Sequence, residues 1–390
     1  MSRILLVANT SWYLYNFRLH LLGELRNSGL EVALVAPHDA YTPLLQAHGF
    51  TVHNWLVARS SINPIAEAHA LNDLRRIYQR EAPDLVHHFT IKACLYGTIA
   101  AKLANIPHVI NAVTGLGHVF LGRRKRTRAL RLALLPLYRA VFSARRSTVV
   151  FQNADDLEHL VNLGITDGHR SYLIRSSGVD IDHFSPEAAS IPRQPSFHQP
   201  VRLLFPSRLI HEKGVRELLS ACRALWSQGV DLELLVAGSL DEGNRSSLSP
   251  AELEEIRSEA RVRCLGHVNE MRAVYASVDL VVLPSYREGL SRALIEAAAM
   301  ELPIITTDVP GCRDVVDHGI SGLLVPAGDA DSLRLSIQLL LNNPDLAFRF
   351  GLAARQKVLL EFQVSLVNER TLLQYHRLLK QPILSAIVAS

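Results

Sequence analysis

The stretch Pro284-Ser-Tyr-Arg-Glu-Gly-Leu-Ser-Arg-Ala-Leu-Ile-Glu-Ala-Ala298 is the best guide to how this chain folds. The apolar run before it, 278–283, is typical of a buried parallel strand. The segment 291–300 is rich in Ala, Leu and Glu and predicts a helix. Between them lies a short loop with Glu288 and the flexible Gly289. A strand, a short loop and a helix in this order are the repeating unit of a parallel α/β sheet.

The beginning of the predicted helix is an expected anion site, because its first backbone N–H groups are free and its dipole is positive there. Glu288 lies just before the helix, and Glu296 lies about two turns into it. Two carboxylates at different heights of one crevice suit a polyhydroxylated ligand that carries phosphate. The alternative is a surface helix with ordinary solvated glutamates.

The same alternation of strands and helices runs through both halves of the chain. In the first half we expect strands at 4–8, 32–36, 85–88, 109–112 and 148–152, and helices at 17–27, 65–81, 97–104 and 155–163. In the second half we expect strands at 202–205, 232–237, 262–265, 280–283, 304–306 and 322–325, and helices at 214–228, 250–259, 268–276, 291–300 and 330–341. The pattern predicts an α/β protein with two doubly wound domains whose ligands bind at the carboxyl ends of the strands.

The predicted domains are 1–185 and 201–364, joined by the polar, proline-rich segment 186–200. A last helix, about 365–379, is expected to return to the N-terminal domain together with the rest of 365–390.

Composition supports a globular protein with more than one core. The chain has 390 residues, 48% of them hydrophobic, and a formal net charge of +4. No apolar run approaches the roughly 18–20 residues that span a bilayer, and the first residues do not resemble a signal peptide. The four cysteines, Cys94, Cys222, Cys264 and Cys312, have neither zinc-ligand nor disulfide-framework spacing. A cytoplasmic location is the expectation.

Basic charge is concentrated in one segment, 121–146. The chain has no acidic residue between Asp84 and Asp155, and arginines alternate there with leucines and aromatic residues. This pattern is typical of an amphipathic helix at an anionic membrane surface, which predicts a peripheral protein on the inner face of the cell membrane. A solvated helix with a core-facing stripe is the alternative. Nucleic acid is the third possible partner, but the interleaved apolar residues disfavour it.

The quoted stretch resembles the Glu-x7-Glu motif of the family 4 retaining glycosyltransferases of GT-B fold. The resemblance continues through 303–314 and 322–326 and covers nearly the whole chain. It implies two Rossmann-like domains facing a central cleft, with the acceptor bound by the N-terminal domain, the nucleotide-sugar donor bound by the C-terminal domain, and no cofactor. No cluster of His, Cys or Asp residues in the sequence suggests a required metal. The resemblance also implies that Glu288 lies against the donor sugar and that Glu296 binds the ribose hydroxyls. Backbone N–H groups of Gly289, Leu290 and Ser291 would then face the donor.

Arg208 and Lys213 are the candidate cations of the donor site. A cation at a helix N-terminus is unfavourable unless an anion also lies there. Pairing with Glu212 or Glu217 is the alternative. The spacing resembles the Arg-x4-Lys element of the same family, which implies that both residues stabilise the departing nucleoside diphosphate. The resemblance also places His267 and Val268 among the donor-binding residues.

The turn after the first strand, 9–18, is expected to face both substrates. Asn9 and Thr10 are candidate donors of hydrogen bonds to the sugar nucleotide, although many relatives have a glycine pair here and this chain has none. Tyr13 and Arg18 are candidate acceptor-binding residues. An ordinary βα loop with buried aromatic residues is the alternative.

The segment Thr114-Gly-Leu-Gly-His118 resembles a bacterial subgroup that builds glycans on polyprenyl diphosphate carriers. The resemblance implies acceptor-binding roles for Thr114, Gly115 and His118, and it places Lys92 near a lipid diphosphate. His88, at the end of a predicted strand, is either a functional or a satisfied structural histidine.

The predicted activity is retaining transfer of a hexose or N-acetylhexosamine from a UDP-sugar to a polyprenyl-diphosphate-linked or other glycan acceptor. A nucleotide-sugar 2-epimerase of the same fold and a non-catalytic membrane-bound scaffold are the alternatives. The pair Asp329 and Asp331 resembles a metal motif, but its position before a helix predicts a helix cap.

Overall fold

The computed structural model describes residues 1–58, 63–116, 125–187, 196–244 and 246–380. The chain forms two compact units, and each has its own core. Unit 1 comprises 1–178 and 365–390, and unit 2 comprises 179–364. The N-terminal domain expected from the sequence ends at 185, a little later than unit 1. Most of the expected linker, 188–195, lies outside the described residues.

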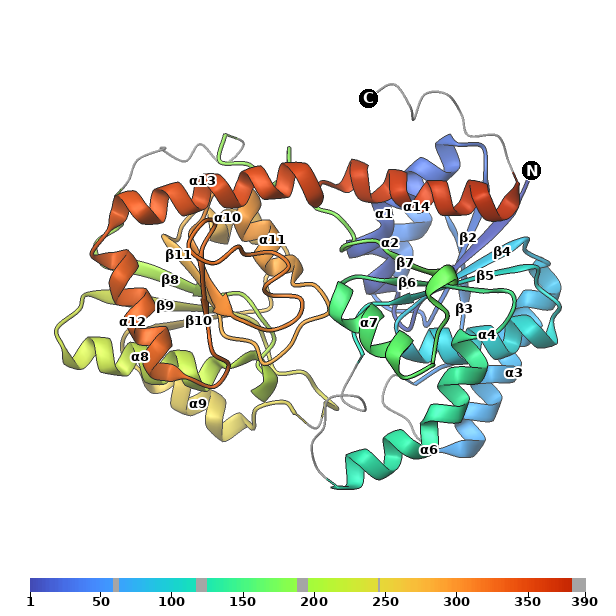
Figure 1. The fold of residues 1–390 in the computed structure, drawn as a ribbon, viewed down its shortest axis with the longest axis horizontal. Coiled ribbons are helices and arrows are strands. Elements are labelled where there is room, and N and C mark those ends of the chain that lie inside the picture. The colour runs from blue at the N-terminus through green and yellow to red at the C-terminus, as the bar shows by residue number, and fades with distance from the viewer. Residues whose placement is uncertain (59–62, 117–124, 188–195, 245, 381–390) are drawn as a thin grey trace. The chain divides into compact units, whose positions relative to one another are not determined.

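Unit 1 is built on a sheet of seven parallel strands in the order β3-β2-β1-β4-β5-β6-β7 (Figure 1). The strands are β1 (Arg3–Val7), β2 (Glu31–Ala36), β3 (Thr51–Asn54), β4 (Leu85–Phe89), β5 (His108–Val113), β6 (Ser147–Phe151) and β7 (Ser171–Leu173). The helices are α1 (Ser11–Asn27), α2 (Thr42–Ala47), α3 (Pro64–Glu81), α4 (Ile91–Leu103), α6 (Lys125–Phe142), α7 (Ala154–Asn162) and α14 (Val364–Leu379).

The two faces of this sheet are covered by different helices. Leu6 of β1 packs in a cluster with residues of α1 and α14, whereas the next-door Leu5 packs with residues of α3 and α4. Successive side chains of a strand point to opposite faces, so the sheet is covered on both sides. The return of α14 brings Val367, Leu372 and Tyr375 into the core of unit 1.

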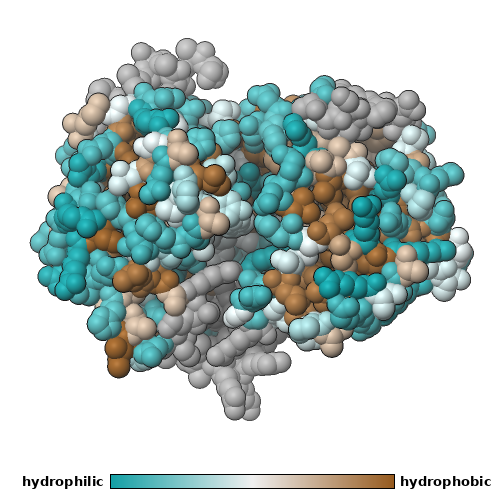
Figure 2. All heavy atoms as spheres, turned by 180° about the vertical axis from the view of Figure 1, so that it is seen from behind, coloured by the Kyte–Doolittle hydropathy of each residue, from teal (hydrophilic) through white to brown (hydrophobic). Residues whose placement is uncertain are grey.

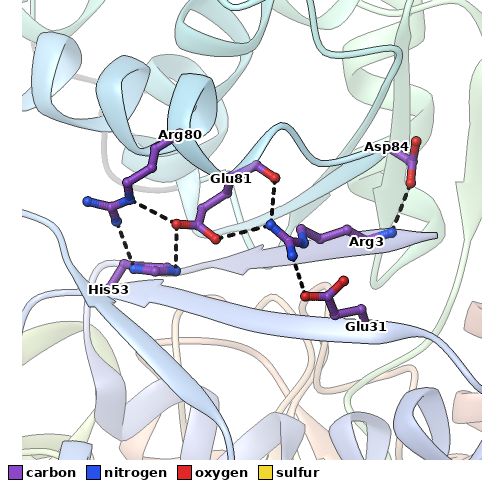
Figure 3. A network of polar contacts seen from close by, with 6 residues as sticks. All are labelled: Arg3, Glu31, His53, Arg80, Glu81 and Asp84. Atoms are coloured by element: carbon purple, nitrogen blue, oxygen red, sulfur yellow. Dashed lines mark hydrogen bonds and ion pairs between the residues drawn. The ribbon is translucent and has the colours of Figure 1, made fainter. Parts of the chain in front are cut away.

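A network of charged residues lies near the amino ends of the first strands. It consists of Arg3, Glu31, His53, Arg80, Glu81 and Asp84 (Figure 3). Arg3 Nη2 lies 2.5 Å from Glu31 Oε1, and Arg3 Nη1 donates to the backbone oxygen of Glu81 at 3.0 Å. Burial opposes ionisation of Glu81, but the hydrogen bond from Arg80 and the nearby positive charges outweigh it and lower the pKa of Glu81. Arg3 and Arg80 therefore both have carboxylate partners.

Unit 2 repeats the design with a sheet of six parallel strands in the order β10-β9-β8-β11-β12-β13. The strands are β8 (Val201–Phe205), β9 (Leu232–Ala237), β10 (Val262–Gly266), β11 (Leu280–Leu283), β12 (Ile304–Thr307) and β13 (Leu323–Val325). The helices are α8 (Val215–Ser227), α9 (Pro250–Ser258), α10 (Met271–Tyr275), α11 (Arg292–Ala299), α12 (Ala330–Leu341) and α13 (Pro344–Glu361). The predicted fold class, two doubly wound parallel α/β domains, is confirmed.

On the face that Figure 2 shows, hydrophilic residues predominate and hydrophobic ones lie in separate patches. Among the described residues no helix combines the length and the apolar character that crossing a bilayer requires. Single exposed apolar side chains, such as Leu132 at 67% and Leu360 at 71% exposure, are normal for a folded protein.

Candidate active site

The sheet of unit 2 has a position where its strand order reverses, between β8 and β11. From β8 the chain proceeds to β9 and β10 on one side, and then returns to β11 on the other. In open α/β sheets, ligands bind at such a position, beside the carboxyl ends of the strands. Lys213 follows β8 and Glu288 follows β11. The two residues singled out in the sequence therefore come from the two strands that flank this position.

Lys213 and Glu288 form an ion pair. The Nζ atom of Lys213 donates to Oε1 of Glu288, and the two side chains are only 13% and 11% exposed. Ser285, which is fully buried, donates its hydroxyl to the same carboxylate oxygen at 2.6 Å. A buried ion pair needs additional hydrogen bonds to offset the loss of hydration. Ser285 supplies one, and it fixes the position of the carboxylate.

Backbone contacts lock the loops that carry this pair. The N–H of Tyr286 donates to the backbone oxygen of Glu212 at 2.8 Å, which joins the loops after β11 and β8. The N–H of Glu288 donates to Pro310 O at 3.1 Å, which joins the loops after β11 and β12. At Gly311 an added Cβ would lie 2.6 Å from Glu288 O, and φ is +79°. Glycine is required there, because the two loops approach too closely for a side chain.

The amide of Ser291 is engaged within the protein. Its N–H donates to Gly311 O at 3.2 Å, so of the three amides expected to face the donor, this one already has a partner. Ser291 precedes α11 without capping it by its side chain, and α11 begins at Arg292. Gly289 and Leu290 lie in the same loop, between Glu288 and the start of that helix.

Cys312 lies behind the pair and is fully buried. Burial raises the pKa of its thiol to about 12, and the negative charge of Glu288 acts in the same direction. The thiol is therefore neutral at physiological pH, which excludes a thiolate nucleophile beside Glu288.

Arg208 has a carboxylate partner that the sequence did not indicate. Its Nη1 donates to Oδ2 of Asp241, which follows β9, and Asn244 donates to the same oxygen at 2.8 Å. Arg208 remains half exposed, whereas Asp241 is 7% exposed. Asp241 thus orients a guanidinium that still reaches solvent. Glu212, an alternative partner for the basic pair, instead accepts from Ser246 Oγ at 2.5 Å.

Glu296 is held by α10 and by its own helix. The buried Tyr275 donates its hydroxyl to Ala293 O at 3.0 Å and to Glu296 Oε2 at 3.3 Å. Arg292 Nε donates to Glu296 Oε1 at 2.8 Å. Glu288 and Glu296 thus have separate partners within unit 2. Tyr275 and Arg292 escaped the sequence argument, although Arg292 lies one helical turn before Glu296.

His267 and Val268 follow the carboxyl end of β10. His267 is exposed, and Val268 packs against the core of unit 2. The helix expected to begin at Val268 begins at Met271, because the Glu270 side chain caps it by accepting from the N–H of Arg272 at 3.2 Å.

In unit 1 the expected loop 9–18 is mostly helix. Thr10 accepts from the N–H of Tyr13 at 3.2 Å and so caps α1, which begins at Ser11. Asn9 precedes this cap. The hydroxyl oxygen of Thr10 thereby satisfies one of the amides of the first turn. Tyr13 and Arg18 then lie on α1 rather than in a loop.

The remaining acceptor candidates have different environments. Lys92 Nζ donates to Glu67 Oε1 at 2.9 Å and to Ala58 O at 2.6 Å, so its charge is paired inside unit 1. Thr114 and Gly115 follow the carboxyl end of β5 and are partly exposed. His118 lies outside the described residues.

His88 is a satisfied structural histidine. It is fully buried, with Nε2 at 2.8 Å from Tyr78 Oη and Nδ1 at 2.8 Å from Asn111 Oδ1. Burial lowers its pKa to about 4, and the hydrogen bond with Asn111 opposes this only in part. The ring packs against Gly97, where an added Cβ would lie 2.3 Å from Nε2.

The apolar side of the basic segment is partly used by the core. Tyr138, Val141 and Phe142 of α6 are buried in a cluster of unit 1. Those three side chains form the core-facing stripe that the solvated-helix alternative predicts. Leu132 of the same helix is 67% exposed. Arg139 is exposed and donates to Leu163 O at 2.8 Å.

Asp329 caps α12, as predicted. It accepts from the N–H of Ser332 at 2.9 Å and from its hydroxyl at 2.6 Å. Within the ranges that the structure describes, no three His, Cys, Asp or Glu side chains gather as a metal site would require.

Comparison with known proteins finds a glycosyltransferase family model for each half of the chain. Residues 188–357 match the family described as glycosyl transferases group 1, and residues 3–153 match the family described as glycosyl transferase 4-like. The chain therefore carries a glycosyl transferases group 1 domain and a glycosyl transferase 4-like domain. The family resemblance noted in the sequence is therefore confirmed, and glycosyltransferase activity is supported.

Curated relatives of this glycosyltransferase act in glycan assembly. One is the N,N'-diacetylbacillosaminyl-diphospho-undecaprenol alpha-1,3-N-acetylgalactosaminyltransferase of Campylobacter jejuni, 26% identical over 97% of this chain and 99% of the relative. Another is the capsular polysaccharide biosynthesis glycosyltransferase CapM of Staphylococcus aureus, 27% identical over 78% of this chain and 80% of the relative.

Solved structures share the fold of this glycosyltransferase. Anabaena HepE in complex with UDP and glucose has a TM-score of 0.78 and 19% identity, covering 96% of this chain and 99% of HepE. Sucrose-phosphate synthase from Thermosynechococcus elongatus has a TM-score of 0.77 and 19% identity, covering 97% of this chain and all of the other, 100%.

Proposed function

We propose that this protein is a retaining glycosyltransferase that moves a hexose or N-acetylhexosamine from a UDP-sugar to a polyprenyl-diphosphate-linked glycan. The observation that carries the proposal is the buried pair of Lys213 and Glu288 where the strand order of unit 2 reverses. It offers a cation for phosphate and a carboxylate for sugar hydroxyls at one point. The acceptor class is that named for the Campylobacter relative, and the UDP donor is that bound to HepE.

In the proposed reaction Lys213 and Arg208 stabilise the negative charge that develops on the leaving diphosphate. Lys213 must then exchange its contact with Glu288 for the donor phosphate. Glu288, held by Ser285, remains a hydrogen-bond acceptor for the sugar. Glu296 binds the ribose, with Tyr275 and Arg292 fixing its carboxylate. The chemistry requires no metal and no cofactor from the protein.

We further propose that the protein works at the inner face of the cell membrane. A lipid-linked acceptor resides there, and the arginines of 121–146 are attracted to anionic lipid. Leu132 is an exposed apolar side chain in the same segment.

The test is transfer of label from a panel of UDP-sugars into an organic-extractable product, with bacterial membrane lipids as acceptors. Glu288→Gln should lower kcat/KM by roughly 100-fold or more, because a neutral amide is a weaker hydrogen-bond acceptor for the sugar in the transition state than a carboxylate. Glu254→Gln, a carboxylate on α9 that is 68% exposed, is the matched control and should leave the rate unchanged. The product anomer, determined by NMR, tests retention.

EDTA should not change the rate. Absence of label from every donor, or equal activity of wild type and Glu288→Gln, would contradict the proposal.

A further inference from the structure

Arg18 of α1 is a buried cation without a carboxylate partner among the described residues. The whole residue is 6% exposed, and no carboxylate oxygen of the described residues lies within 4.0 Å of its guanidinium nitrogens. Its guanidinium lies 4.4 Å above the ring of Phe89, and Nη2 donates to the hydroxyl of Tyr13 at 3.0 Å. The Nε atom is buried and has no hydrogen-bond partner. An ionised group removed from water in this way is unfavourable unless something else binds it.

The surroundings of Arg18 do not neutralise it. The nearby groups are His87 on β4 and Tyr375 on α14, whose hydroxyl lies 2.5 Å from His87 Nδ1. Burial, followed by the positive charge of Arg18, lowers the pKa of His87 well below its usual value, so this histidine is neutral. Arg3, at the amino end of β1, differs from Arg18, because Arg3 contacts the carboxylates of Glu31 and Glu81 (Figure 3).

The position of Arg18 in the fold is that of a ligand site. Its partner Phe89 is the last residue of β4, and α1 follows β1 directly. The order of the unit 1 sheet reverses between β1 and β4. Arg18 therefore lies where a doubly wound sheet binds its ligand, as Lys213 and Glu288 do in unit 2. The next residue, Thr90, has φ +75° and a buried hydroxyl without a partner, an unusual conformation for a β-branched residue.

We propose that Arg18, stacked on Phe89 and held by Tyr13, binds a phosphate group of the acceptor. A guanidinium carries five N–H donors in a planar fork that matches phosphate oxygens, and one of its nitrogens, Nε, has no hydrogen-bond partner here. Most of the side chain is out of water, so its attraction to an anion is screened less than at the surface. The identity of the anion as acceptor phosphate rests on the proposed function, but the existence of the anion site does not.

The test uses Arg18→Met, which keeps the length of the stem and removes the charge, and Arg18→Lys, which keeps the charge and loses the fork. Arg26→Met is the matched control. Arg26 also lies on α1 and stacks on a phenylalanine, Phe50, at 5.1 Å. Binding of inorganic pyrophosphate is measured by calorimetry with saturating UDP, which occupies the proposed donor site. Thermal unfolding and the KM for the lipid-linked acceptor are measured for each variant.

We expect wild type and Arg26→Met to bind pyrophosphate alike, Arg18→Lys to bind more weakly, and Arg18→Met to lose binding. Arg18→Met should raise the acceptor KM by roughly 10- to 100-fold, the effect of one charge-assisted hydrogen bond, without changing the donor KM. Because an unpaired buried charge is removed, the Tm of Arg18→Met should equal or exceed that of wild type.

Pyrophosphate binding by Arg18→Met at wild-type strength would overturn the anion site. If the Tm of this variant also fell by several degrees, the role of Arg18 would be structural. Loss of pyrophosphate binding with an unchanged acceptor KM would overturn the assignment to the acceptor and indicate a site for free phosphate. Absence of transfer by wild type would contradict the proposed function, but the calorimetric result would still stand.

Discussion

At the scale of single residues, the proposed donor site depends on places where a side chain is excluded. An added Cβ at Gly214 would lie 2.1 Å from Pro284 O, and φ there is +74°. Gly214 directly follows Lys213, and Pro284 directly follows β11. The close approach of these two backbones therefore sets how near Lys213 comes to Glu288.

Gly214→Ala should lower both stability and activity, because the new methyl group pushes the two loops apart. Gly229→Ala is the matched control, since φ there is +83° and nothing lies within 4 Å of the added Cβ. We expect Gly229→Ala to cost about 1 kcal/mol in free energy of unfolding, the effect of positive φ alone, with normal transfer. Gly214→Ala should cost more and reduce kcat/KM. Equal effects in urea unfolding and in the transfer assay would show that the contact with Pro284 is unimportant.

The sequence revealed the candidate site residues that belong to short local motifs, and not those that only a contact in the fold brings to the site. Glu288, Glu296, Arg208 and Lys213 belong to short local patterns and were identified from spacing. Asp241 was not, because its contact with Arg208 joins loops that are 33 positions apart. The helical start at Ser11 was missed because a run of aromatic residues with no acidic residue in its first turn lacks the usual helix signals.

At the scale of elements, buried central strands were the easiest to predict. β9 and β11 have the predicted bounds, because strands covered on both faces are continuous apolar runs. β3 and β7 lie at the two edges of the unit 1 sheet and were missed, since they are short and carry polar residues. The amphipathic character of α6 was recognised, but its sequence left open whether Tyr138, Val141 and Phe142 face lipid or the core of unit 1, where they lie.

The exposed part of α6 leads to a prediction about membrane binding. Leu132→Glu should lower cosedimentation with phosphatidylglycerol vesicles by about tenfold or more. The change removes an apolar side chain that would enter the bilayer, and it adds a negative charge that the anionic lipid repels. Leu360→Glu on α13, at a site that is 71% exposed, is the matched control and should bind like wild type. Neutral phosphatidylcholine vesicles should bind all three proteins weakly. Equal binding of wild type and Leu132→Glu to the anionic vesicles would exclude a role for this residue.

At the scale of the whole molecule, the two units differ in their buried histidines. His87 and His88 are buried in unit 1, and so is His376 on the returning helix α14. None of the described histidines of unit 2 is buried. Burial lowers the pKa of His87 well below its usual value and that of His88 to about 4. The two units should therefore respond differently to acid.

The sign of the response follows from where the protons bind. Between pH 6.5, the usual pKa of histidine, and pH 4, the unfolded chain binds a proton at His88 that the folded chain does not. Stability is therefore retained above pH 6.5 and falls as pH is lowered, by about 1.4 kcal/mol per pH unit for each such histidine. His87 acts in the same direction. We expect unit 1 to lose stability before unit 2.

Amide hydrogen exchange from pH 7 to pH 4.5, corrected for intrinsic rates, separates the units by peptide. Peptides from β4 and β5 should lose protection as the pH falls, while those from β8 and β9 change less. His88→Gln should be less stable at pH 7, because its contacts with Tyr78 and Asn111 are altered, but its stability in unit 1 should depend less steeply on pH. His48→Gln replaces an exposed histidine of the same unit and should keep the wild-type slope. If His88→Gln also keeps that slope, or if unit 2 opens first, the buried histidines of unit 1 do not determine the acid sensitivity of this protein.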